Sequence, residues 1–214
     1  GGIGVQVAIA GPPTASPVGT PGPSGNGWFA GGGGGSGNTG WQSPSGTSAG
    51  GAGGGGTGSA TGAGTAGTYS TGGGGAGGAY GSPDSSGKNG GSGIVVVRYQ
   101  IGSQQSGTAK ASGGSISYYG GKTIHAFTST GTFSSNNPFN ETCECIIIGG
   151  GSGTSNPSSP GSHGAGGGGA GAVYDRNNIP VNVSGPWTFN VTVGAGGGRG
   201  APGSKGSNGS PSIV

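Results

Sequence analysis

The residue types that most often carry chemistry are rare in this chain, and one short motif suggests a phosphate site. Gly121-Lys122-Thr123 matches the end of a phosphate-binding loop, in which a glycine five residues before the Gly-Lys pair lets backbone N–H groups surround the phosphates. Position 116 is Ile instead, and the segment that follows Lys122 alternates like a strand where a helix is required. The sequence therefore predicts no nucleotide site and no bound cofactor.

The thiols and imidazoles form the second group with chemical potential. Cys143 and Cys145 are separated by one residue, which places both thiols on one face of a strand and makes a disulfide between them strained. A metal site would need more ligands, and only His125 and His163 remain. A nucleophilic triad would need an activated serine and an orienting acid, for which no setting is visible. We expect buried cysteines, a structural His125, no metal site and no catalytic residues.

The composition excludes most classes of protein. Glycine accounts for 64 of the 214 residues, hydrophobic residues make up 27%, charged residues make up 5%, and there is no Leu or Met. Each glycine inside a helix costs about 1 kcal/mol relative to alanine, which excludes a helical protein. No apolar run approaches the roughly 18 residues of a membrane-spanning helix. The few scattered basic residues form no nucleic-acid patch, so we expect a chain that is not an enzyme.

Six segments have the pattern of β-strands, because they are rich in Ile, Val, Tyr, Phe and Thr and bounded by Gly, Pro, Asn and Ser. Trp187 to Val193 alternates strictly between apolar and polar residues, as a half-buried strand does. The apolar runs Ile94 to Val97 and Ile146 to Ile148 indicate strands covered on both faces. Gly120-Gly121 predicts a two-residue hairpin turn. The six segments are Ile3 to Ile9, Gly93 to Ile101, Gly114 to Tyr119, Lys122 to Phe127, Thr142 to Ile148 and Trp187 to Val193.

Glycine tracts separate these segments, and their backbone groups must be satisfied if they are ordered. Polyproline-II-like helices have three residues per turn and no internal hydrogen bonds, so glycine segments of this type can pack side by side and bond to one another. The alternative is a set of flexible linkers. The predicted fold is all-β with glycine-rich polyproline-II-like (polyglycine II) helices, in which short strands are interleaved with packed tracts and no α-helix occurs. The tracts are Gly31 to Gly35, Gly50 to Gly56, Gly72 to Gly78, Gly149 to Gly153, Gly164 to Gly171 and Gly194 to Gly200.

The same construction plan occurs twice along the chain. Residues 1–102 form a glycine-tract and β half that ends in the IVVVRY strand, and residues 103–214 form a β-hairpin and glycine-tract half.

Two further sets of residues are candidates for surface contacts. Aromatic residues beside tracts and turns suit glycan or partner binding, although capping of the tracts and filling of the core explain them better; they are Trp28, Phe29, Trp41, Tyr69, Tyr80, Tyr118, Tyr119 and Tyr174. Four Asn-x-Ser/Thr sequons matter only if the source glycosylates; they begin at Asn140, Asn182, Asn190 and Asn208.

Several stretches resemble glycine-rich domains of tail-fibre-like structural proteins of marine bacteriophages. They are GGSGIVVVRY (90–99), ASGGSISYYGGKTIHAFTSTGTF (111–133), ECIIIGGG (144–151), VTVGAGGG (191–198) and the closing GSNGS (206–210). The order is reversed relative to that family, as expected for one period of a longer tandem array cut in a different register. The resemblance implies a structural or host-contacting role on an extended fibre and names no catalytic residue.

The sequence thus predicts a non-enzymatic structural protein that forms or decorates an extended extracellular or virion fibre. Its expected partners are copies of itself, because little apolar side-chain area offsets the ordering of so many glycines. The alternative is a receptor-binding tip, an adhesin module that recognises host-surface glycans.

Overall fold

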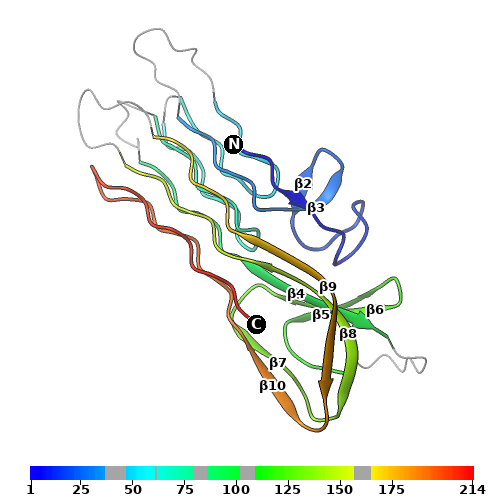
Figure 1. Cartoon of the computed structure of the whole chain (residues 1–214). Helices are drawn as coiled ribbons and strands as arrows, with labels where there is room; N and C mark the ends of the chain where they lie inside the picture. Colours follow the sequence, from blue (N-terminus) through cyan, green and yellow to red (C-terminus); the bar gives the residue numbers. More distant parts are fainter. Residues whose placement is uncertain (37–46, 61, 80–85, 102–108, 157–164) are drawn as a thin grey trace.

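The computed structural model describes residues 1–36, 47–60, 62–79, 86–101, 109–156 and 165–214. Ten β-strands occur in these ranges, and no helix is found among them. Figure 1 shows the strands gathered toward one end of an elongated body, from which the glycine tracts extend side by side. The predicted all-β class is confirmed.

The largest sheet has five antiparallel strands in the order β5-β6-β4-β8-β9. Its hairpin β5–β6 turns at Gly120 and Gly121, whose positive φ angles of 58° and 74° fit the two-residue turn that the sequence predicts. The bounds are Ser115–Tyr119 (β5), Lys122–Phe127 (β6), Ile94–Gln100 (β4), Phe139–Ile148 (β8) and Val173–Val183 (β9).

The central strand β4 is buried on both faces, as its continuous apolar run predicts. Val95 and Val97 lie in one hydrophobic cluster with Phe133 and Trp187, whereas Ile94 belongs to a second cluster on the opposite face. Ile146 and Ile148 of β8 also belong to the second cluster, while Ile147 packs against the first.

Two small sheets supply the cover for these faces. The pair β7 (Gly131–Ser135) and β10 (Trp187–Val191) contributes Phe133, Trp187 and Val191 to the first cluster. The N-terminal sheet has the order β1-β3-β2 and contributes Phe29 to the second cluster. Its strands are β1 (Val5–Gln6), β2 (Thr20–Gly22) and β3 (Gly25–Phe29).

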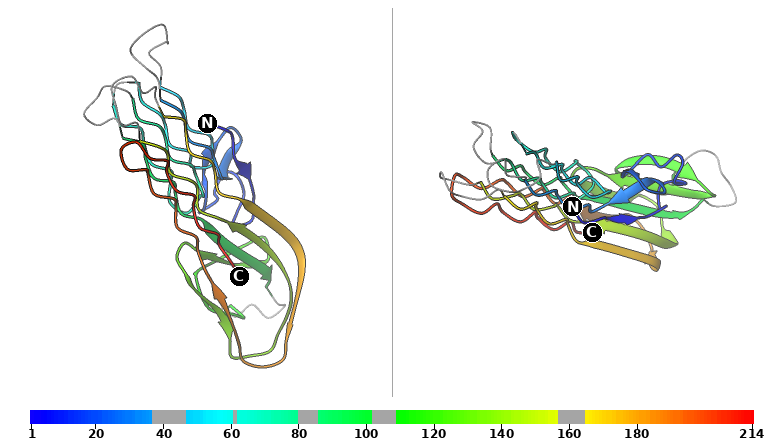
Figure 2. Two further views of the ribbon diagram at one scale, coloured as in Figure 1. Left: turned by 60° about the vertical axis from the view of Figure 1, so that its left-hand side comes forward. Right: turned by 90° about the horizontal axis from the view of Figure 1, so that it is seen from above.

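The glycine tracts leave the sheets together and run alongside one another in both views of Figure 2. They come from both halves of the sequence. Gly33 bonds to Gly168, and Gly151 bonds to Gly91, while strand β4 of the first half lies between β6 and β8 of the second. The sequence division at residue 102 therefore runs through one hydrogen-bonded structure.

All six expected strand segments contain a strand. The observed bounds differ most from the expected ones in the first segment. The segment Ile3 to Ile9 is paired as a strand only at Val5–Gln6, while β8 starts three residues earlier than expected, at Phe139. Strands β2, β3, β7 and β9 were not predicted. β9 contains Pro180 and a polar Asp-Arg-Asn-Asn run, which an edge strand tolerates because one of its sides faces solvent.

Candidate functional site

The glycine tracts bond to one another through their backbones, and the partner changes at every residue. The amides of Gly31, Gly32, Gly33 and Gly34 donate in turn to the carbonyls of Gly53, Gly2, Gly168 and Gly56. The first and the fourth of these bonds therefore go to the same neighbouring segment, three residues apart. A strand, whose side chains and hydrogen-bonding groups alternate with period two, would alternate between two neighbours instead.

The same three-residue period occurs in the tract that follows β8. The amides of residues 149 and 152 donate to the segment 169–172, those of 150 and 153 to the segment 207–210, and those of 151 and 154 to the segment 88–91. A tract with three residues per turn presents its backbone groups in three directions, which is what this period requires. The polyproline-II conformation itself stays a prediction, and the observed period supports it.

Close packing of the backbones explains why these positions are glycine. A Cβ atom built on Gly33 would overlap the carbonyl oxygen of Gly75, and one built on Gly150 would overlap that of Ala195. Gly168 is similarly closed by the carbonyl of Ser152, whereas nothing lies within 4 Å of a Cβ on Gly166. These described tracts are bonded and packed against each other, unlike the flexible linkers that were the alternative.

Three charged side chains lie together on the face of the large sheet that the N-terminal segment covers. The Arg98 Nε donates to Glu144 Oε2 at 2.6 Å, and Lys122 forms an ion pair with the other carboxylate oxygen. Partial burial raises the pKa of Glu144, but hydrogen bonds from Lys122 and Arg98 outweigh it and lower that pKa. Arg98 also donates to the carbonyls of Ala8 and Ile9 at 3.0 and 3.1 Å. The cluster therefore ties the N-terminal segment to β4.

The lysine of the phosphate-loop-like motif is one of these charges. Lys122 begins β6 directly after the Gly120-Gly121 turn, and Thr123 continues the strand. A strand thus follows the motif, where a phosphate-binding loop requires a helix. The ion cluster could not be predicted, because its three members come from strands β4, β6 and β8, which are neighbours only in the folded sheet.

His125 is fully buried and hydrogen-bonded at both ring nitrogens. Its Nδ1 lies 2.7 Å from the carbonyl oxygen of Gly113, and its Nε2 lies 3.1 Å from the Tyr99 hydroxyl. A carbonyl only accepts, so Nδ1 carries the proton and Nε2 accepts from Tyr99. The Tyr99 oxygen in turn accepts from the amide of Ala111 at 3.2 Å. The expected structural role of His125 is confirmed.

Burial also accounts for the two thiols. Cys143 and Cys145 are unpaired and only 2% and 6% exposed, on the same face of β8. Burial raises the pKa of each thiol to about 12, with further increases from Glu141 for Cys143 and from Cys143 and Asp175 for Cys145. Both behave as the small buried hydrophobes that the sequence predicts. No cluster of three potential metal ligands occurs within the described ranges.

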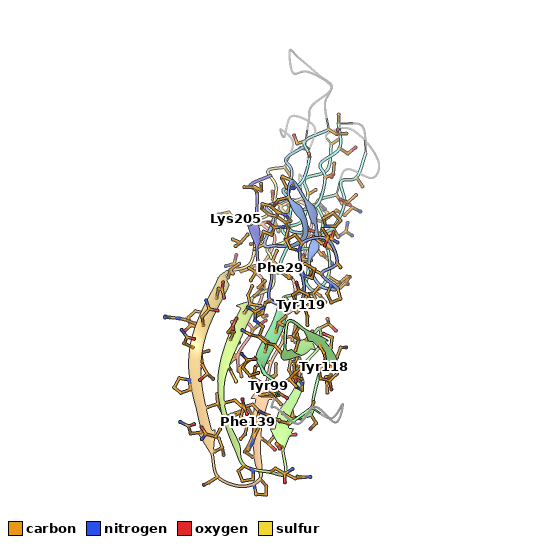
Figure 3. All side chains as sticks on the ribbon, turned by 90° about the vertical axis from the view of Figure 1, so that its right-hand side faces the viewer. Phe29, Tyr99, Tyr118, Tyr119, Phe139 and Lys205 are labelled. Atoms are coloured by element: carbon orange, nitrogen blue, oxygen red, sulfur yellow. The ribbon has the colours of Figure 1, made fainter. Side chains whose placement is uncertain are left out.

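The aromatic candidates do not share one surface. Phe29 is fully buried in the core, so a contact role for it is wrong: its position in β3 turns it toward the large sheet, at the junction seen in Figure 3. Trp28 is partly buried and packs over Gly22. Tyr118 and Tyr119 lie at the β5 edge of the large sheet, Tyr174 lies at its β9 edge, and Tyr69 lies in a turn between tracts. Trp41 and Tyr80 fall outside the described residues.

The four sequon asparagines are all exposed. Asn140 of β8 and Asn182 of β9 are directly opposed across the ladder, and Asn190 lies on β10. Asn208 lies in the segment that bonds to the tract after β8. Their placement leaves room for glycosylation wherever the source carries it out.

The arrangement defines a class of protein: an all-β chain in which a backbone-bonded bundle of glycine tracts extends from packed β-sheets. The chain matches the family model described as a glycine-rich domain over residues 127–214, from the end of β6 to Val214. Comparisons with curated proteins and with solved structures gave no match. No helix long and apolar enough to cross a membrane occurs in the described part of the chain.

Proposed function

We propose that the chain is a non-enzymatic structural module of an extended extracellular or virion fibre, with other copies of itself as its partners. The observation that carries this proposal is the tract bundle, in which successive residues of a tract donate to different neighbouring segments. Such a bundle forms a stiff rod, because backbone hydrogen bonds hold its tracts together without side-chain packing. A fibre needs that property, whereas a site for chemistry does not.

The side chains support the same proposal. Arg98 and Lys122 are both paired with Glu144, His125 is used in a buried hydrogen-bond chain, and the thiols are buried. None of these groups is arranged as a nucleophile with its base. The virion location rests on the resemblance of IVVVRY, KTIHAFTSTGTF and ECIIIGGG to tail-fibre-like proteins of marine bacteriophages, and on nothing else.

The receptor-binding alternative needs exposed rings that gather on one surface. Tyr118 and Tyr119 are separated from Tyr174 by the width of the five-stranded sheet. The described residues therefore give the fibre role more support than the adhesin role.

The described tract-to-tract bonds all lie within one copy, so self-association is not needed to form them. We expect the isolated chain to fold alone and to join end to end as its concentration rises. Sedimentation velocity over a wide concentration range, followed by electron microscopy of the concentrated sample, tests this expectation. Ordered linear assemblies support the proposal, and a chain that stays monomeric in every sample contradicts the role of self-assembling module.

A further inference from the structure

Three Asn-Gly pairs occur in the sequence, and they begin at Asn26, Asn89 and Asn208. Asparagine is a thermolabile residue, and it loses its side-chain amide most readily before glycine, because no Cβ atom hinders attack by the following backbone nitrogen. The reaction needs that nitrogen to be free of other bonds and the asparagine side chain to be accessible. The first pair lies inside β3, where Gly27 is buried, so accessibility is lost there.

The second pair is exposed but held by hydrogen bonds. The Asn89 Oδ1 accepts from the amide of Arg199 at 2.9 Å. The amide of Gly90 donates to the carbonyl of Gly197 at 3.0 Å. Both the side chain and the nitrogen that would attack it are therefore occupied by bonds to the neighbouring tract.

The third pair is exposed and has neither bond. Figure 1 shows the final segment of the chain, in red, at the outer edge of the bundle. The amides of Ser207 and Ser210 each donate to the adjacent tract at 2.9 Å. Between these two residues, neither the exposed Asn208 side chain nor the amide of Gly209 has a hydrogen bond to any residue that the structure describes. This pair therefore meets both requirements of the reaction.

Packing of the bundle explains why residue 209 is glycine. A Cβ atom built on Gly209 would overlap the carbonyl oxygen of Gly150 in the tract beneath it. The close approach of the two tracts thus requires the residue that makes the preceding asparagine labile. Because the Gly209 amide is unbonded, the backbone can make the local rotation that ring closure needs.

We propose that Asn208 is a site of spontaneous deamidation in the folded chain, with water as the co-reactant, and that Asn89 is protected. The Gly209 nitrogen loses its proton and bonds to Cγ of Asn208, and the side-chain nitrogen leaves as ammonia. Water then opens the resulting cyclic imide. Cleavage at Cγ gives aspartate, and cleavage at the main-chain carbonyl carbon gives isoaspartate. Either route consumes a water molecule and releases ammonia, with no oxidation or reduction.

The two products affect the bundle differently. Aspartate adds a negative charge at an exposed position and leaves the backbone unchanged. Isoaspartate also lengthens the backbone between Ser207 and Ser210, whose carbonyls accept from the amides of Gly153 and Gly150, each at 3.0 Å. The longer connection shifts one of these bonds out of alignment. The inference does not depend on the proposed fibre role.

The test incubates the full chain in isotopically labelled water, in a mildly alkaline buffer at physiological temperature, before it is unfolded and digested with trypsin. Cleavage after Lys88, Arg98 and Lys205 places Asn89 and Asn208 on separate peptides, 89–98 and 206–214. Mass spectrometry follows the loss of the amide and the uptake of labelled oxygen in each peptide. We expect Asn208 to react at least tenfold faster than Asn89 in the native chain. In guanidinium chloride the two should react at similar rates.

Two matched variants assign the reaction to its residue. Asn208→Gln keeps an exposed amide, but its longer side chain closes the ring far more slowly. Ion-exchange chromatography of the aged native chain should show a growing acidic form, and Asn208→Gln should slow its growth at least tenfold. Asn89→Gln should leave the growth rate unchanged. Circular dichroism checks that both variants keep the fold.

Two results would overturn the proposal. Asn208 and Asn89 react at the same rate in the native chain, which shows that the bonds around Asn89 give no protection. Alternatively, Asn208 keeps its amide in the native chain over a period in which the unfolded chain loses it, which shows that packing of the tract protects this residue as well.

Discussion

The amide of Gly33 donates a 3.0 Å hydrogen bond to the carbonyl of Gly168, a residue from the other half of the sequence. The amide of Gly168 then donates to the carbonyl of Gly75, at 2.7 Å, so three distant tracts meet at this point. The carbonyl of Ser152 closes the remaining space beside Gly168. Around Gly168 the interior of the bundle therefore consists of backbone atoms, and each tract depends on its neighbours for its hydrogen bonds.

Replacement of Gly168 by valine should disrupt the bundle, because the new Cβ would overlap the Ser152 carbonyl. We expect Gly168→Val to lower the free energy of unfolding by at least about 2 kcal/mol, as overpacked cores do. The matched control is Gly166→Val, where the Cβ meets open space and the change should be within about 0.5 kcal/mol. Urea unfolding of both variants measures the difference, and equal stabilities would show that the tracts are not packed as described.

Buried His125 should make the fold less stable in mild acid. Burial lowers the pKa of His125 below its usual 6.5, and the hydrogen bond to Gly113 only partly opposes this. Below pH 6.5 the His125 side chain is therefore protonated in the unfolded chain but stays neutral in the folded chain. The free energy of unfolding should fall as the pH drops from 6.5 toward the folded-state pKa, and it should be insensitive to His125 above 6.5.

The matched variant for this effect is His125→Gln, which cannot titrate. Its stability at pH 8 should be lower, because the bonds to Gly113 and Tyr99 are lost or weakened, yet its decline between pH 7 and pH 5 should be shallower. Thermal melts of both proteins across this range provide the comparison. Parallel declines would assign the acid sensitivity to other groups.

The two thiols should be unreactive until the chain unfolds. Burial raises the pKa of Cys143 and of Cys145 to about 12, so the thiolate is scarce at neutral pH. We expect disulfide-exchange reagents to label the native chain far more slowly than the same chain in denaturant. Rapid labelling of both thiols under native conditions would mean that the sheet face above β8 is open.

The β5–β6 turn offers a local test of backbone conformation. Gly120 has a φ of 58° and open space around its Cβ position, so conformation alone decides which residues fit. Gly120→Asn should be close to neutral, because asparagine is common at this position of such turns. Gly120→Val should cost roughly 1–2 kcal/mol in the left-handed region. Urea unfolding again distinguishes them, and similar losses for both would contradict the turn type.

Strand content was predictable wherever apolar residues were dense. β6 has the bounds that the sequence predicts, and the burial of β4 on both faces follows from its unbroken Ile-Val-Val-Val run. β7 was missed because Phe133 is its only large apolar residue, and β9 because Pro180 and its polar run hide the alternation. The pairing among tracts could not be predicted at all. Their residues are nearly identical, so nothing in the sequence says which tract lies beside which.

That uniformity has a consequence for how the bundle finds its alignment. Because the bonding pattern of a tract repeats every three residues, sliding one tract by three positions would restore almost the same set of backbone bonds. Sparse side chains distinguish the two alignments: the Ser207 side chain accepts from the Gly198 amide, and the Thr154 side chain accepts from the Lys88 amide. Serine and threonine thus favour one register among otherwise interchangeable glycine tracts. A chain without them would form several bundles of shifted register and nearly equal energy.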